Sequence, residues 1–180
     1  MQAVHFLINT VFDLYIMVIL LRVWLQVARA DFYNPFSQFI VKATQPIVAP
    51  LRRIIPGIGG LDLATIVFAF VVAGVKVFAL MSLAGASFAP IAVLISALFI
   101  LLTAVFKLIF WVLILRAILS WVSQGRNPIE AVMIQLTEPL LAPVRRFIPP
   151  IGGLDLSMIV VLIGLQFVEI LVNDLLGRLF

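Results

Sequence analysis

The chain of 180 residues has no cysteine and a single histidine, His5. Without cysteine, disulfides, thiolate metal sites and thiol catalysis are excluded. One histidine also excludes a metal site that needs several imidazoles. Charged residues are scarce too, at 11% of the chain against about 25% in soluble domains. A water-soluble enzyme, a nucleic-acid-binding protein and a disordered chain are therefore all poor fits.

Apolar sequence takes the place of charge: 64% of the residues are hydrophobic and the mean hydropathy is +1.27. A helix needs roughly 20 apolar residues to cross a bilayer. The third apolar run is long enough to be divided, but no glycine or proline interrupts it after Pro90, so one long helix is predicted. The sequence predicts an all-α membrane protein with four spans. They cover about residues 4–27, 63–83, 88–122 and 156–176.

The chain also repeats itself. Residues 46–63 return as residues 139–156 at an offset of 93, and most positions are identical. Two spans accompany each copy, so both copies enter the membrane in the same orientation and form parallel repeats. Each repeat consists of a span, a connector and a span. The predicted repeats are residues 1–86 and 87–180.

Basic residues gather in the two connectors, whereas the link between residues 84 and 90 carries no charge. Basic loops stay on the cytoplasmic side of a membrane, so both connectors are predicted to be cytoplasmic and both termini to face outward. The basic residues are Arg29, Lys42, Arg52 and Arg53 in the first connector and Arg126, Arg145 and Arg146 in the second.

Each connector carries the pattern Pro-x-x-x-Pro-x-Arg-Arg-x-Ile-Pro-x-Ile-Gly-Gly-x-Asp after an Asn-Pro helix start. This doubled signature, at fixed spacing over nearly the whole chain, resembles the YggT family, which includes the YlmG proteins. The resemblance implies a protein of the bacterial cytoplasmic (inner) membrane without an assigned reaction or cofactor. In bacteria the family is associated with osmotic-stress tolerance and potassium uptake, and in plastids with cytochrome cofactor assembly and nucleoid organisation.

Asn34 and Asn127 each precede a proline and are predicted to cap the connector helices, since Asn accepts an unpaired backbone N–H and proline suits the first helical position. These short helices are expected to be amphipathic, to lie in the headgroup zone, and to stop before Pro46 and Pro139. Two interpretations of the double arginines stay open: binding of anionic lipid headgroups or an acidic partner segment, or plain positive-inside anchoring. These arginines are Arg52, Arg53, Arg145 and Arg146.

The Ile-Gly-Gly-Leu-Asp segments could be read as phosphate loops, because paired glycines let a backbone approach a ligand. No Lys-Ser/Thr follows, so a Walker loop is excluded. We favour a turn made by the glycines and a helix cap made by the aspartate. The residues are Gly59, Gly60 and Asp62 in the first copy, and Gly152, Gly153 and Asp155 in the second.

Four charges lie inside the predicted spans. Asp13 is equivalent to Lys107, and Lys76 to Glu169, so each equivalent position has the opposite sign. An isolated charge at that depth costs about 2.5 kcal/mol or more. We therefore predict a neutral cluster with Asp13–Lys107 and Lys76–Glu169 as partners; the alternative is that the two lysines extend separately toward the membrane surface.

The favoured function is non-enzymatic: a membrane organising or assembly factor linked to osmotic stress, with anionic lipids and a protein partner or a second copy as ligands. No cofactor, metal or nucleic acid is expected. Homo-oligomerisation is expected through a small-residue face at Ala69, Ala73 and Gly74. The alternative function is an ion (potassium) channel or transporter component, for which the sequence offers few polar lining residues.

Overall fold

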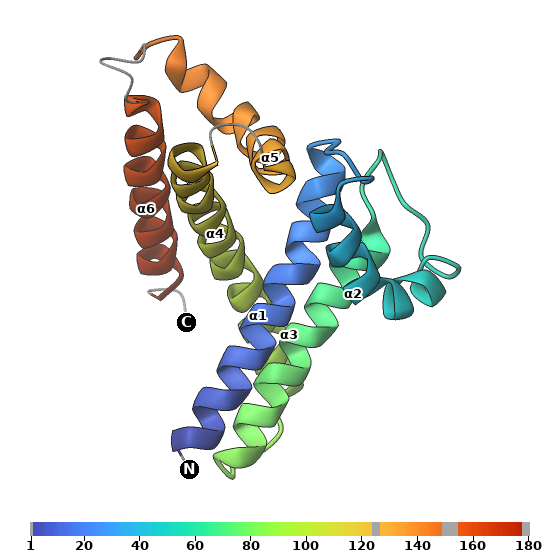
Figure 1. The fold of residues 1–180 in the computed structure, drawn as a ribbon. Helices are drawn as coiled ribbons and strands as arrows, with labels where there is room; N and C mark the ends of the chain where they lie inside the picture. Colours follow the sequence, from blue (N-terminus) through green and yellow to red (C-terminus); the bar gives the residue numbers. More distant parts are fainter. Residues whose placement is uncertain (1, 124–126, 149–154, 178–180) are drawn as a thin grey trace. The chain divides into compact units, whose positions relative to one another are not determined.

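A computed structural model describes residues 2–123, 127–148 and 155–177 of the chain. Its named elements are all α-helices (Figure 1). In chain order they are α1 (Gln2–Val27), α2 (Pro35–Leu51), α3 (Leu63–Leu83), α4 (Pro90–Val122), α5 (Pro128–Arg145) and α6 (Leu156–Gly177).

Four helices, α1, α3, α4 and α6, are long and apolar enough to cross a membrane. This confirms the predicted all-α class and the four spans. Helix α4 is a single unbroken helix of 33 residues, because its sequence offers no residue that would end a helix partway. At about 1.5 Å per residue it exceeds the hydrocarbon thickness, as predicted.

The chain divides into two compact units, residues 1–105 and 106–180. The boundary falls within α4, whereas the predicted repeats meet at residue 86. The first part of α4 packs with the first unit, because Ala97 and Ala104 belong to its buried core. Helix α4 is therefore shared between the two units.

In the first unit, α1 and α3 lie side by side and α2 packs against both (Figure 1). The core contains Ile16 and Ile19 of α1 and Phe68, Ala69 and Ala73 of α3. Both alanines are fully buried, and their small side chains allow the helices to approach closely. Ala69 and Ala73 are therefore used within the chain and do not offer a free face to a second copy, whereas Gly74 is half-buried. Homo-oligomerisation itself stays a prediction.

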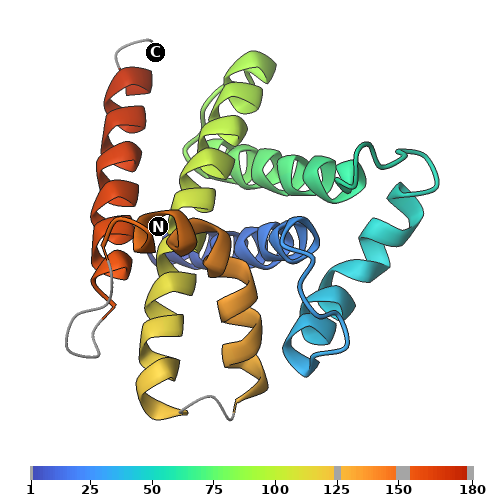
Figure 2. The same cartoon turned by 90° about the horizontal axis from the view of Figure 1, so that it is seen from above.

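In the second unit, α5 packs against α6, and it runs beside the second half of α4 (Figure 2). The buried side chains of α5 include Val132, Met133, Leu136 and Leu141. Val132 and Met133 are each followed by Leu136, four and three residues later, and Leu141 comes five residues after that, which places them on one side of the helix.

The prediction that Pro46 and Pro139 stop the connector helices is wrong. Helix α2 continues through Pro46 and Pro50, and α5 through Pro139 and Pro143. A proline lacks the N–H that would bond to the carbonyl four residues earlier. These four prolines are exposed, so the freed carbonyls lie on the outer side, while Ile40, Thr44 and Val48 bury the opposite face of α2. Packing of that face outweighs the local effect of the prolines.

Candidate functional site

An intramembrane ion pair joins the first two spans. The Nζ of Lys76 on α3 lies 2.7 Å from Oδ1 of Asp13 on α1. The Lys76 side chain is buried, with 7% of its surface exposed, whereas that of Asp13 is 44% exposed. A charge this deep in a bilayer usually requires a partner. Lys76 therefore has its counter-ion within the first repeat.

The other two charges of the predicted cluster lie in the second unit. Lys107 on α4 is exposed, and Glu169 on α6 accepts a hydrogen bond from Gln166 at 3.2 Å. Each predicted pair, Asp13–Lys107 and Lys76–Glu169, would join a residue of the first unit to one of the second. These two pairs therefore stay predictions. The equivalent of the observed pair within the second repeat is Lys107 with Glu169, with the signs exchanged.

Asparagine side chains fix the start of both connector helices. Oδ1 of Asn34 accepts from the N–H of Phe36 at 2.9 Å, and Oδ1 of Asn127 accepts from the N–H of Ile129 at 2.9 Å. Each asparagine has an extended backbone and is followed by proline at the first helical position. Both connectors therefore enter their helices in the same way.

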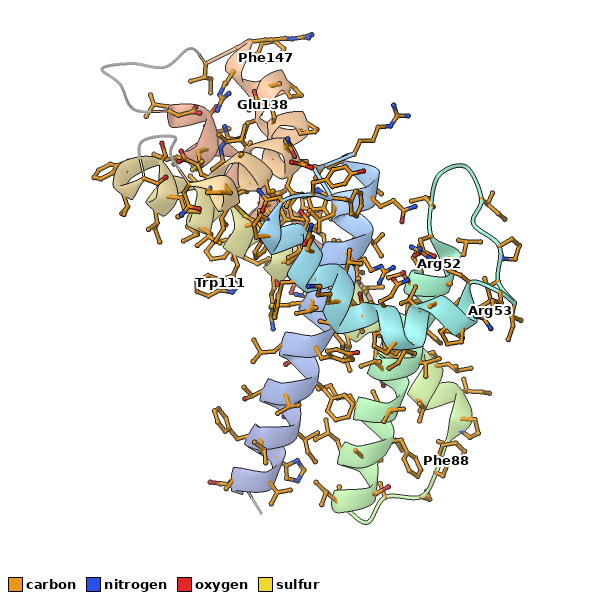
Figure 3. All side chains as sticks on the ribbon, turned by 45° about the vertical axis from the view of Figure 1, so that its right-hand side comes forward. Arg52, Arg53, Phe88, Trp111, Glu138 and Phe147 are labelled. Atoms are coloured by element: carbon orange, nitrogen blue, oxygen red, sulfur yellow. The ribbon has the colours of Figure 1, made fainter. Side chains whose placement is uncertain are left out.

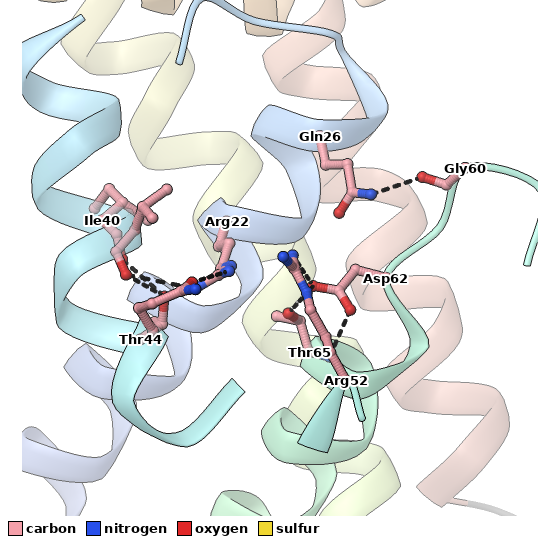
Figure 4. A network of polar contacts seen from close by, with 10 residues as sticks. Arg22, Gln26, Ile40, Thr44, Arg52, Gly60, Asp62 and Thr65 are labelled. Carbon is pink, nitrogen blue, oxygen red and sulfur yellow. Dashed lines mark hydrogen bonds and ion pairs between the residues drawn. The ribbon is translucent and has the colours of Figure 1, made fainter. Parts of the chain in front are cut away.

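An ion pair ties the end of α2 to the start of α3. Nε and Nη2 of Arg52 lie 3.0 and 2.5 Å from Oδ2 of Asp62, which also accepts from the Thr65 hydroxyl (Figure 4). The other carboxylate oxygen of Asp62 caps α3 by accepting from the N–H of Thr65. One buried carboxylate thus starts the span and holds the connector against it.

The intervening turn needs glycine. Gly59 and Gly60 have φ values of +61° and +85°, which a residue with a Cβ adopts only with strain. Nε2 of Gln26 on α1 donates to the carbonyl of Gly60 at 2.9 Å. The turn is therefore fastened to the first span as well. Gly152 and Gly153 lie outside the described residues.

The second connector repeats the ion pair and extends it. Nε and Nη2 of Arg145 lie 2.9 and 2.5 Å from Oδ2 of Asp155, whose other oxygen accepts from the N–H of Ser157 at 3.1 Å. Nη1 of Arg145 also lies 2.8 Å from Oε1 of Glu138. Arg145 therefore has two carboxylate partners.

These contacts alter the pKa values of both aspartates. Burial opposes ionisation of Asp62, but hydrogen bonds from Arg52 and Thr65 outweigh it and hold its pKa below the usual value. Burial likewise opposes ionisation of Asp155, and bonds from Ser157 and Arg145 lower its pKa. The hydrogen bond to Asp155 raises the pKa of Arg145. Both ion pairs are therefore charged at neutral pH.

A second arginine in each repeat joins the first span to the connector, and sequence reasoning missed it. Nη1 of Arg22 donates to the Thr44 hydroxyl at 2.6 Å, and Nη2 donates to Oε1 of Gln45 at 2.7 Å. Arg22 is almost fully buried. The sequence places Arg22 near the membrane edge, where a long side chain can extend to the surface, whereas the structure directs it to the connector helix α2.

The second repeat has the same arrangement. Nη1 of Arg116 donates to the Thr137 hydroxyl at 2.5 Å, and Nη2 lies 3.1 Å from Oε2 of Glu138. Arg116 and Thr137 are the repeat equivalents of Arg22 and Thr44. Their joint recurrence was the sequence signal that could have indicated this contact.

The second arginine of each pair faces outward. Arg53 and Arg146 are exposed, and each precedes an exposed apolar side chain. Ile54 is 79% exposed and Phe147 is 86% exposed; Arg53 and Phe147 are labelled in Figure 3. The two arginines of each pair therefore differ: the first is paired with a carboxylate of the same repeat, and the second is exposed.

Among the residues that the structure describes, no three His, Cys, Asp or Glu side chains gather as a metal ion would need. The polar contacts instead fix connectors against spans. Four apolar helices long enough to cross a bilayer, with a basic helical connector clamped between the spans of each pair, define an integral membrane protein.

Comparison with known proteins gives the family. A family model described as CCB3/YggT matches residues 1–83 and 95–176. The chain is 58% identical to "Uncharacterized protein in proC 3'region" of Vibrio alginolyticus, covering 100% of this chain and 98% of that protein. It is 49% identical to "Uncharacterized protein YggT" of Escherichia coli K12, covering 98% and 92%. No solved structure gives a significant match. The chain belongs to the CCB3/YggT family and contains two tandem repeats.

Proposed function

We propose that the protein is a non-enzymatic organising or assembly factor of the bacterial cytoplasmic membrane, whose connectors bind anionic lipid headgroups. The observation that carries the proposal is the difference between the two arginines of each pair. Arg52 and Arg145 are neutralised by internal carboxylates. Arg53 and Arg146 are exposed and are followed by exposed apolar side chains.

A basic residue followed by an exposed apolar one suits the boundary between headgroups and acyl chains. The guanidinium interacts with lipid phosphates, and the apolar side chain enters the boundary region. Each basic residue near an anionic leaflet contributes about 1 kcal/mol. Because ion pairs clamp both connectors to the spans, Arg53 and Arg146 are held at fixed places instead of on mobile loops.

The orientation of the protein is part of the proposal. The excess of basic residues in the connectors favours a cytoplasmic location for them. A connector fixed at the inner leaflet could then gather lipid together with a protein partner or a second copy of the chain. The association of the family with osmotic-stress tolerance is the physiological role we assign to this activity.

The experiment compares two charge-matched variants. Arg53→Gln with Arg146→Gln removes the exposed arginines, and Arg29→Gln with Lys42→Gln removes two other exposed basic residues. The purified proteins are reconstituted with mixed phosphatidylglycerol and phosphatidylcholine, and the lipids retained by each are quantified. Both variants lose the general attraction of about 1 kcal/mol per basic residue near the leaflet. We expect the first variant to lose several-fold more of the anionic-lipid enrichment than the control, because each of its arginines is followed by an apolar side chain that enters the boundary region. Equal loss in both variants would mean that the arginines are only anchors.

The alternative function is a potassium channel or transporter component. The observation in its favour is the ion pair of Asp13 with Lys76, since ionisable residues within spans often mark ion pathways. Liposomes containing the purified protein test this alternative directly. A potassium flux above that of empty vesicles would overturn the organising role, whereas stable co-purification with a membrane complex would support it.

A further inference from the structure

At one pair of equivalent positions in the connectors, the second repeat has a carboxylate and the first repeat has a neutral amide. In the second repeat, the carboxylate of Glu138 lies between two arginines, 3.1 Å from Arg116 and 2.8 Å from Arg145. The equivalent residue of the first repeat, 93 positions earlier, is Gln45. The first repeat therefore keeps both arginines, Arg22 and Arg52, but lacks the carboxylate that links their equivalents.

A pocket of about 350 Å³ lies at this place in the first unit. It is lined by Arg22, Gln26, Phe32, Val41, Gln45 and Arg52. A neighbouring pocket of about 400 Å³ shares Gln26 and Arg52 and reaches the glycine turn at Gly60. Figure 4 shows Arg22 of α1 directed to Thr44 and Arg52, at the end of α2, directed to Asp62; both side chains line the pocket.

The charges around the pocket do not balance. Arg52 is paired with Asp62, and among the described residues the hydrogen-bond partners of Arg22 are the neutral groups Thr44, Gln45 and the carbonyl of Val41. The first repeat thus places two guanidinium groups beside one carboxylate. The second repeat places two beside the carboxylates of Glu138 and Asp155. Because a buried charge without a counter-ion is costly, the first repeat would gain stability from a bound anion.

Hydrogen-bond donors remain for such an anion. A guanidinium has five N–H groups, and the contacts of Arg22 with the described residues use three of them. The contacts of Arg52 with Asp62 use the N–H of Nε and one N–H of Nη2, which leaves both N–H groups of Nη1 and the second one of Nη2. The side-chain amides of Gln26 and Gln45 line the same pocket and can donate as well.

We infer that this pocket binds a phosphate group, and that the group takes the place of the Glu138 carboxylate. Arginine forks match the geometry of phosphate oxygens, and two arginines line this pocket. The pocket lies where the first span ends and the connector begins, the level at which lipid phosphates are found. The source is the headgroup of an anionic phospholipid or free inorganic phosphate. The inference rests on the proposed function in one respect: it assumes that the connector lies among the lipid headgroups.

The experiment exchanges the two matched residues in the full chain. Gln45→Glu puts into the first repeat the carboxylate that the second already has, and Glu138→Gln removes it from the second. Native mass spectrometry counts tightly bound phosphatidylglycerol, with phosphatidylcholine as the zwitterionic reference. In parallel, the shift of the melting temperature with inorganic phosphate is measured in detergent.

We expect the wild-type chain to hold one tightly bound phosphate group. Gln45→Glu should weaken this binding by about tenfold or more, since repulsion replaces charge-assisted hydrogen bonds. Its melting temperature without ligand should be equal or higher, which shows that it folds. Glu138→Gln should create a second site of the same kind.

The two ligand arms identify the source of the phosphate. Competition between phosphate and phosphatidylglycerol for one site supports a headgroup, and stabilisation by phosphate alone supports a free anion. Wild-type binding that persists in Gln45→Glu, or no selective binding by the wild type, would overturn the inference. The outer variant, Arg53→Gln with Arg146→Gln, should keep this site even if the proposed function fails, so the two failures are distinguishable.

Discussion

Reversing one charge of the intramembrane pair should destabilise the first unit strongly. Asp13→Lys would place a second ammonium beside that of Lys76, whose side chain is only 7% exposed. Removing one partner of a buried pair costs about 3–5 kcal/mol. Since the Asp13 side chain is 44% exposed, we expect the lower end of that range, about 3 kcal/mol.

The second repeat indicates how to rescue this variant. Its equivalent positions carry Lys107 and Glu169, so the reversed order of charges already occurs there. Asp13→Lys combined with Lys76→Glu reproduces that order in the first repeat. The double variant should recover most of the lost stability, because a lysine from α1 can meet a carboxylate on α3 across the same helix contact.

The assay is a double-mutant cycle on denaturant unfolding in detergent, which isolates the coupling between the two residues. Asp174→Lys, the same charge change at an exposed position of α6, serves as the control and should shift stability little. A double variant no more stable than Asp13→Lys alone would refute the pairing. Rescue by Lys107→Glu in place of Lys76→Glu would instead support the pairs predicted between repeats.

Two further predictions concern the connectors. Single cysteines at the equivalent exposed positions Gln38 and Ala131 should both resist a membrane-impermeant thiol reagent in intact cells, while one at Ser87 should react; labelling of only one connector would contradict parallel repeats. Because the pKa values of Asp62 and Asp155 are lowered by folding, their contribution to stability is present above about pH 4 and lost as pH falls through the folded pKa. In melting curves between about pH 3 and 7, Asp62→Asn should show a smaller acid-dependent loss than the wild type, and an unchanged loss would contradict the ion-pair mechanism.

The spans could be predicted because hydropathy and length depend on the local sequence alone. The predicted span at residues 63–83 coincides with α3, and the long third run forms one helix. The ends of the connector helices could not be predicted in this way. Pro46 indicates a stop, but Thr44 and Val48 are buried on the inner face of α2 and keep the helix intact, and that burial depends on tertiary packing.

In the site, too, contacts between residues close in the sequence could be predicted, and contacts that depend on tertiary packing could not. The capping contacts of Asn34 and Asp62 lie within three residues in the sequence, so residue type and position are enough to indicate them. The contact between Arg52 and Asp62 spans ten residues and depends on the glycine turn. The contact between Arg22 and Thr44 spans 22 residues and requires α2 to fold back onto α1. In the sequence, only the presence of the equivalent residues Arg116 and Thr137 in the second repeat indicates this contact.

The repeat also separates residues that serve the fold from those free to acquire a function. The Arg52–Asp62 and Arg145–Asp155 pairs recur with the same signs, because each copy must hold its connector against a span. The intramembrane positions exchange sign between the copies, which can keep a pair neutral and so places no new demand on the helices. The difference between Gln45 and Glu138 is of another kind. The two side chains have nearly the same shape and each contacts the arginine of the first span in its repeat, but only Glu138 carries a charge. Because a buried arginine without a counter-ion is costly, and Arg22 is buried beside Gln45, the pocket beside Gln45 is the place to look for a ligand.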